Sequence, residues 1–148
     1  MLHFTLLCVG TIKEKYMREA IGDYAKRLSK YVKLDFIEVP EAISIKREGD
    51  ALLARLPERA FIVALDLTGK MLSSPGLAAL VDKRAAAGYS HFVFIIGGSD
   101  GLDSSVISQA DFRLCMSEMT FPHQMARLII LEQLYRAMKI NHGERYHK

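Results

Sequence analysis

An uninterrupted apolar run that ends in glycines constrains the fold of this 148-residue chain more than any other feature. Residues 92–96 (Phe-Val-Phe-Ile-Ile) carry no polar side chain, which is typical of a strand buried on both faces of a parallel sheet. Gly97, Gly98 and Gly101 follow within five positions. Open α/β sheets bind ligands at the carboxyl ends of such strands, where glycines let a ligand approach the main chain. The run predicts such a site; the alternative is a glycine turn that serves only the topology.

Two further strands are predicted to end in polar loops. Residues 61–65 are apolar and run into Asp66, and residues 112–116 form a short strand before a polar loop and Pro122, which fits the first turn of a helix. The Gly-Lys pair at 69–70 lacks the other residues of a P-loop, and residues 97–101 lack the spacing of the dinucleotide fingerprint. We expect the three strand ends to converge on one pocket. Phosphate binding is not supported, whereas a nucleotide-like ligand held by main-chain groups stays open.

Strands and helices are predicted to alternate along the whole chain. This order favours an α/β fold with a mostly parallel sheet flanked by helices, in a single domain over residues 1–148. The expected strands are 2–9, 33–39, 61–66, 91–97 and 111–115, and the expected helices are 13–31, 45–56, 73–88, 104–109 and 122–140.

Basic residues gather in two places, although the net charge is only +3. The last four residues, 145–148, read Arg-Tyr-His-Lys. A basic helix face is usually only solvated, but together with this tail it is a candidate surface for a polyanion such as RNA. The basic residues of the amino-terminal part are Lys13, Lys15, Arg18, Lys26, Arg27, Lys30 and Lys33.

The two cysteines, Cys8 and Cys115, both lie in apolar strand-like runs. They are predicted to be small buried side chains in a reducing compartment, with no metal cluster nearby. The amino terminus lacks the features of a signal peptide, and no apolar stretch approaches membrane-spanning length. We therefore expect a soluble, cytoplasmic protein without a metal or a membrane partner.

The last helix is apolar around most of its circumference. Between residues 125 and 138 only Arg127, Glu132, Gln133 and Arg136 are charged or amide residues, and they do not share one face. Such a helix must be covered on more than one side. We expect a homodimer with this helix in the interface; the alternative is a central core helix of a monomer.

Five segments of the chain resemble the bacterial RlmH family. These enzymes are pseudouridine N3-methyltransferases of large-subunit (23S) rRNA and belong to the SPOUT class. The segments follow in order and span the chain, and the stretch at 41–48 is shorter than in some relatives. They are residues 9–16, 94–102, 119–125, 132–137 and 143–148.

The resemblance implies a fold, a cofactor and partners. It implies a carboxyl-terminal deep trefoil knot, which is an exception to the rule against knotted chains, with S-adenosylmethionine held bent in the knot mostly by main-chain groups. It also implies homodimers that act on assembled ribosomes, not on DNA, with the tail of one subunit near the cofactor of the other. By position the implied cofactor contacts are Leu65, Gly97, Met116, Ser117, Glu118, Met119, Thr120 and Phe121.

The resemblance also suggests catalytic roles. N3 of a uracil-type base must lose its proton, and histidine suits the base role, so His147 is our first candidate and His123 the second. Arg136 could stabilise the developing charge, and Tyr146 could stack on an exposed base. The structural alternatives are an inert histidine in the tail and an i,i+4 pair of Arg136 with Glu132. The basic tail residues expected to bind RNA are Arg145 and Lys148.

Other functions remain compatible with the residues. A SPOUT methyltransferase of tRNA or another RNA is one, although no separate RNA-binding domain is predicted. A non-catalytic ribosome-binding or assembly factor is another, and it would not need S-adenosylmethionine. A flavodoxin-like nucleotide sensor would require phosphate contacts, which the glycine loop does not offer.

Overall fold

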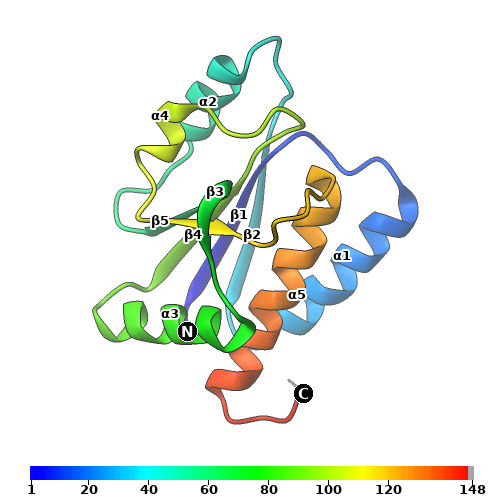
Figure 1. Cartoon of the computed structure of the whole chain (residues 1–148). Helices are drawn as coiled ribbons and strands as arrows, with labels where there is room; N and C mark the ends of the chain where they lie inside the picture. Colours follow the sequence, from blue (N-terminus) through cyan, green and yellow to red (C-terminus); the bar gives the residue numbers. More distant parts are fainter. Residues whose placement is uncertain (147–148) are drawn as a thin grey trace.

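A five-stranded parallel sheet organises the fold, in the order β2-β1-β4-β3-β5 (Figure 1). The structure, a computed structural model, describes residues 1–146. The predicted α/β fold with a parallel sheet is confirmed, and the trefoil knot stays a prediction. The strands are β1 (His3–Val9), β2 (Lys33–Val39), β3 (Phe61–Met71), β4 (His91–Ile96) and β5 (Phe112–Cys115), and the helices are α1 (Lys15–Leu28), α2 (Ile45–Leu53), α3 (Ser74–Ala86), α4 (Ser104–Ile107) and α5 (His123–Asn141).

Helices cover both faces of the sheet, so the central strands are apolar on both sides. Along β4, Phe92 and Phe94 face the core shared with α1, α3 and α5, whereas Val93 and Ile95 face the core shared with α2 and α4 (Figure 1). Each of these four side chains is at most 1% exposed. The prediction of a strand buried on both faces is therefore confirmed.

Local chemistry explains where the helices begin and end. The Ser73 hydroxyl accepts a hydrogen bond from the amide of Gly76 at 3.0 Å, and Pro75 lies in the first turn of α3, as predicted. Gly88 follows α3 with a φ of +109°, which only glycine adopts readily. Helices α1 and α2 are shorter than predicted because turns close them after Leu28 and Leu53.

Strand β3 is longer than the sequence predicted, because it resumes after an irregularity. Its pairing with β5 shifts between Leu65 and Lys70, so the polar residues after Leu65 bulge out of the ladder and the strand then continues to Met71. A Cβ atom on Gly69 would lie 2.5 Å from the carbonyl oxygen of Arg113. Glycine at position 69 therefore lets the bulge approach β5.

Helix α5 is covered inside the chain on more than one side. Its buried residues, such as Ile130 and Leu134, join the core that includes α1 and α3. Arg127 is only 3% exposed and donates to Glu38 at 2.5 Å and to the carbonyl oxygen of Gly10 at 3.2 Å. The chain thus supplies much of the cover that we had assigned to a second copy, and the homodimer stays a prediction. Within residues 1–146, no helix is both long and apolar enough to cross a membrane.

Removing the ring of Phe94 tests the central role of β4. Phe94 is fully buried, so Phe94→Ala is expected to lower the free energy of unfolding by about 3–5 kcal/mol through lost burial and a cavity. Urea unfolding measures this change. Ile43→Ala is the control: its side chain is 96% exposed, so the expected change is within about 0.5 kcal/mol. Equal effects of the two substitutions would contradict the described core.

Candidate active site

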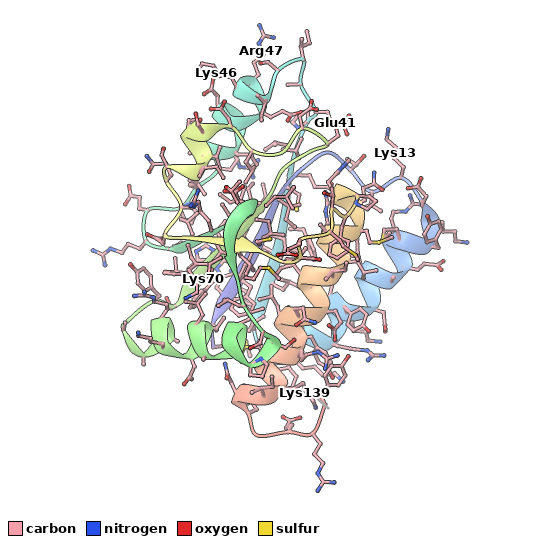
Figure 2. All side chains as sticks on the ribbon, viewed as in Figure 1. Lys13, Glu41, Lys46, Arg47, Lys70 and Lys139 are labelled. Atoms are coloured by element: carbon pink, nitrogen blue, oxygen red, sulfur yellow. The ribbon has the colours of Figure 1, made fainter. Side chains whose placement is uncertain are left out.

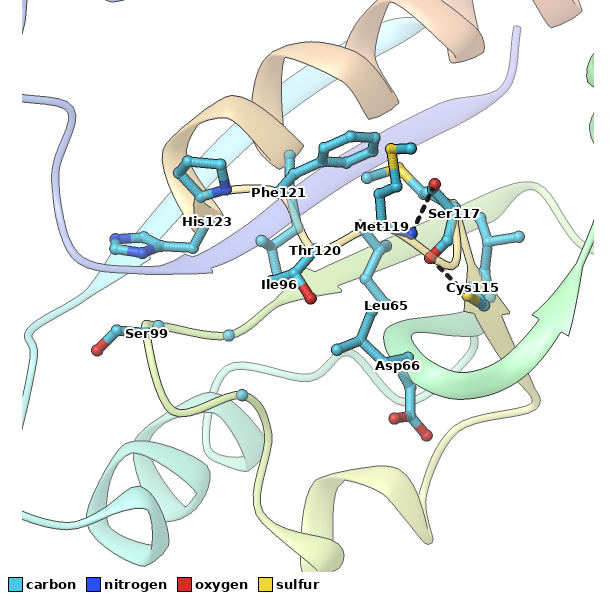
Figure 3. Close-up of a pocket in the computed structure, with 18 of the residues that line it drawn as sticks. Leu65, Asp66, Ile96, Ser99, Cys115, Ser117, Met119, Thr120, Phe121 and His123 are labelled. Atoms are coloured by element: carbon cyan, nitrogen blue, oxygen red, sulfur yellow. Dashed lines mark hydrogen bonds between the residues drawn. The ribbon is translucent and has the colours of Figure 1, made fainter.

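A cavity of about 710 Å³ opens where β4 and β5 end and β3 bulges out of the ladder (Figure 3). The three predicted strand ends therefore meet at one place, as expected for the carboxyl edge of a parallel sheet. Most of its wall comes from three segments: 65–67 in β3, 96–101 from the end of β4 onward, and 114–123 without Glu118, from β5 into α5.

The glycine loop after β4 is folded tightly on itself. Gly98 and Gly101 form an isolated bridge, and the amide of Gly101 donates to the carbonyl oxygen of Gly98 at 3.1 Å. A Cβ atom on Gly97 would lie 2.5 Å from the carbonyl oxygen of Gly101, and Gly101 has a φ of +83°. Glycine at position 97 is thus required by the turn itself, and the same turn leaves this part of the cavity wall without a side chain at that position.

The loop after β5 is held by short polar contacts. The buried thiol of Cys115 donates to the carbonyl oxygen of Ser117 at 3.1 Å, and the Ser117 hydroxyl accepts from the amide of Met119 at 3.0 Å (Figure 3). Seven of the eight predicted cofactor contacts line the cavity, and Glu118 is the exception because it is exposed outside the wall. The seven are Leu65, Gly97, Met116, Ser117, Met119, Thr120 and Phe121.

His123 is the candidate catalytic residue that the structure brings to this cavity. It is the first residue of α5 and lies at the edge of the cavity (Figure 3). Its Nε2 atom is buried and has no hydrogen-bond partner among the described residues. A buried ring nitrogen without a partner costs free energy, so a ligand or a second chain that satisfied it would be favoured there.

Asp66 also lines the cavity, but contacts within the bulge of β3 occupy its side chain. It accepts hydrogen bonds from the amide of Thr68 at 3.2 Å and from its hydroxyl at 2.9 Å, and it lies 3.5 Å from the guanidinium of Arg113. These contacts give Asp66 a structural role in the bulge. The sequence had left its role open.

Arg136 and Tyr146 lie together, away from the cavity. Arg136 is 13 residues beyond His123 on α5, which is about 20 Å along a helix axis. Its guanidinium donates to Glu132 at 2.9 Å, so the predicted i,i+4 pair is present, and the Tyr146 hydroxyl donates to the same carboxylate oxygen at 3.0 Å. Glu132, which was predicted only as an ion-pair partner of Arg136, thus contacts both Arg136 and Tyr146. Arg145 is exposed on the tail, and His147 and Lys148 lie outside the described residues.

Two groups have shifted pKa values that limit their chemistry. Burial, together with the hydrogen bond to Glu132, raises the pKa of Tyr146 to about 12, so this hydroxyl, which is a donor to Glu132, stays protonated well into the alkaline range. Burial raises the pKa of the Cys8 thiol to about 12, which makes it unreactive. The described residues contain no cluster of metal-ligating side chains.

Comparisons with known proteins agree with this architecture. A family model described as "Predicted SPOUT methyltransferase" matches residues 2–147. The protein named "Ribosomal RNA large subunit methyltransferase H" of Ruminiclostridium cellulolyticum is 45% identical over an alignment of 159 positions, which covers 99% of this chain and 100% of that relative. The protein of the same name from Clostridium acetobutylicum is 44% identical, with the same coverage.

These matches span nearly the full length of the chain and of both relatives, and they confirm the resemblance to the RlmH family. The parallel sheet and the cavity at its carboxyl edge fit the same assignment. The chain therefore belongs to the SPOUT methyltransferase family.

Proposed function

We propose that this protein transfers a methyl group from S-adenosylmethionine to N3 of a pseudouridine in 23S rRNA of the assembled ribosome. The observation that carries the proposal is the cavity at the ends of β4 and β5 and the bulge of β3, in a chain of the SPOUT methyltransferase family. The name of the two relatives, ribosomal RNA large subunit methyltransferase H, supports a large-subunit rRNA substrate. The proposal includes a single knotted domain over residues 1–148 that works in the cytoplasm as a homodimer.

The cavity residues fit S-adenosylmethionine in size and chemistry. A volume of about 710 Å³ lies within the range of small-molecule sites. Leu65, Ile96 and Phe121 offer apolar surface for a purine ring, and the loops at 97–101 and 116–121 bring main-chain donors and acceptors to the wall. Asp100 adds a carboxylate that favours a cationic ligand. When bound, S-adenosylmethionine supplies an electrophilic methyl group.

The residues of the chain must then remove the N3 proton of the target base and stabilise the charge that develops. His147 is the proposed base and His123 the second candidate, because neutral imidazole accepts a proton near working pH. Arg136 would stabilise the negative charge on the base, while Lys148 and Arg145 would hold RNA phosphates.

Positions on α5 support a role for a second subunit. Arg136 and Tyr146 lie together at the end of α5 that is remote from the cavity of their own chain. In a dimer, a second copy of the chain would supply these two side chains to the cavity. Two of the residues that line the cavity also carry large exposed apolar side chains: Leu67 is 61% and Met119 76% exposed. Such a patch favours burial against another chain.

Adding a methyl group to the glycine loop tests the cofactor site. Gly97→Ala forces a Cβ atom against the carbonyl oxygen of Gly101, so the loop must open and S-adenosylmethionine binding should weaken about tenfold or more. Titration calorimetry measures the affinity. Gly22→Ala on α1 is the control and should keep wild-type affinity, because a Cβ there meets no atom within 4 Å and Gly22 does not line the cavity. Wild-type affinity in Gly97→Ala would contradict this site.

The reaction itself is tested by transfer of labelled methyl from S-adenosylmethionine to ribosomes that carry or lack pseudouridine, followed by mass spectrometry of the nucleosides. We expect N3-methylpseudouridine only in pseudouridine-containing ribosomes, because only these present the target base. Label on tRNA or another RNA would favour a different SPOUT activity. Tight ribosome binding without transfer would favour a non-catalytic binding factor.

Separate histidine substitutions test the base. His147→Ala is expected to lower the single-turnover rate by about 10²–10⁴, because the N3 proton then has no positioned acceptor. In the same experiment His123→Ala should cost less, and both variants should keep wild-type affinity for ribosomes. A wild-type rate in His147→Ala, with a loss in His123→Ala, would transfer the base role to His123.

A further inference from the structure

The chain reverses direction directly after α5. Gly143 has a φ of +69°, and its amide donates to the carbonyl oxygen of Ile140 at 3.0 Å. The amide of Glu144 then donates to the carbonyl oxygen of Lys139 at 2.9 Å. This turn brings the tail back along the helix, at the end of α5 opposite the cavity (Figure 1).

Three side chains close this turn, and we call them the tail clamp: Tyr31, Lys139 and Glu144. The Glu144 carboxylate accepts from the Lys139 ammonium at 2.5 Å and from the Tyr31 hydroxyl at 2.8 Å, and Lys139 also lies 3.3 Å from that hydroxyl. Tyr31 follows α1, so the clamp joins α1, α5 and the tail. Figure 2 shows Lys139 at the carboxyl end of α5, beside the returning tail.

Two residues beyond Glu144, Tyr146 is held by several contacts. Its hydroxyl bonds to Glu132, its ring meets the Tyr135 ring at 4.9 Å in an edge contact, and the guanidinium carbon of Arg136 lies 4.7 Å from its ring centre. Arg136 and Tyr146 therefore form one unit, and the position of the tail decides whether that unit is assembled.

The clamp keeps its charges through the neutral pH range. The hydrogen bonds from Lys139 and then Tyr31 hold the pKa of Glu144 below its ordinary value, while the bond to Glu144 raises the pKa of both Lys139 and Tyr31. A lowered carboxyl pKa means that the contact is lost only as the pH falls through that lowered value. Raised Lys and Tyr pKa values mean that it is lost at the alkaline end only above their ordinary values.

We propose that Tyr31, Lys139 and Glu144 are positioning residues for methyl transfer: they fix the start of the tail so that Tyr146 and Arg136 are presented as one unit. The inference rests on the proposed function. The Glu144 side chain is 42% exposed, and ion pairs that reach solvent add little to global stability, so this contact on a surface turn acts mainly by ordering the segment that it closes.

Glu144→Ala and Tyr31→Phe test the clamp in the full-length protein. Tyr31→Phe removes only the hydroxyl and keeps the ring that Lys139 and His142 contact. We expect amide hydrogen exchange at 142–146 to accelerate about tenfold in Glu144→Ala and less in Tyr31→Phe, because the free energy of local opening falls. The melting temperature should stay near that of the wild type. Asp50→Ala, which removes the exposed pair with Lys46 on α2, is the matched control and should change neither quantity.

Kinetics on ribosomes complete the test. We expect kcat to fall about tenfold in Glu144→Ala and by less in Tyr31→Phe, while the affinity for S-adenosylmethionine is unchanged, because none of the three clamp residues lines the cavity. Unchanged exchange at 142–146 would overturn the clamp, whatever the activity. Faster exchange with wild-type kcat would overturn the positioning role. Failure of the proposed function would give a different result: the wild-type protein itself would transfer no methyl group. The hydrogen-exchange experiment would still test the clamp in that case.

Discussion

The parallel pairing of β4 with β1 on one side and β3 on the other is the constraint on which the rest of the structure depends. Phe94 points to the three-helix side of the sheet and Val93 to the side of α2 and α4. A slip by one residue would exchange large and small side chains between two packed cores, so the register is firmly specified. The end of β4, and with it the glycine loop, is thereby fixed beside the ends of its neighbours.

A buried guanidinium, paired with a carboxylate that is 38% exposed, links the sheet to the helix that borders the cavity. Arg127, in the second turn of α5, donates to Glu38 in β2 and to the carbonyl oxygen of Gly10 after β1. A buried guanidinium is costly unless it is paired, so these contacts hold the start of α5 against the sheet edge. His123 is one turn away and is therefore placed at the cavity by residues that never touch it. Arg127 contributes to the site as an anchor.

Sequence patterns predicted the elements that depend on local periodicity, and they missed what depends on tertiary contact. The apolar run of β4 and the hydroxyl-proline start of α3 were both correct, because burial and capping are encoded in neighbouring residues. The continuation of β3 was missed, because the polar residues after Leu65 resemble a loop. The strand continues only because Lys70 and Met71 pair with β5, which is a tertiary contact. The convergence of three strand ends was predictable from parallel topology. The exclusion of Glu118 from the cavity wall was not predictable, because it depends on the turn that the Ser117 hydroxyl closes with the amide of Met119.

The candidate chemistry is divided between the two ends of α5, and this division has a physical consequence. A rigid helix about 20 Å long between His123 and Arg136 cannot bring both to one bound methyl group. Either the second group is only structural, or its site is completed by another copy of the chain. In the second case the orientation of each tail affects the reaction in the cavity of the other subunit. Even a weak surface contact such as the tail clamp then affects the reaction rate. Misplacing a reacting group by about 1 Å can cost about 10² in rate, whereas the same looseness hardly changes global stability.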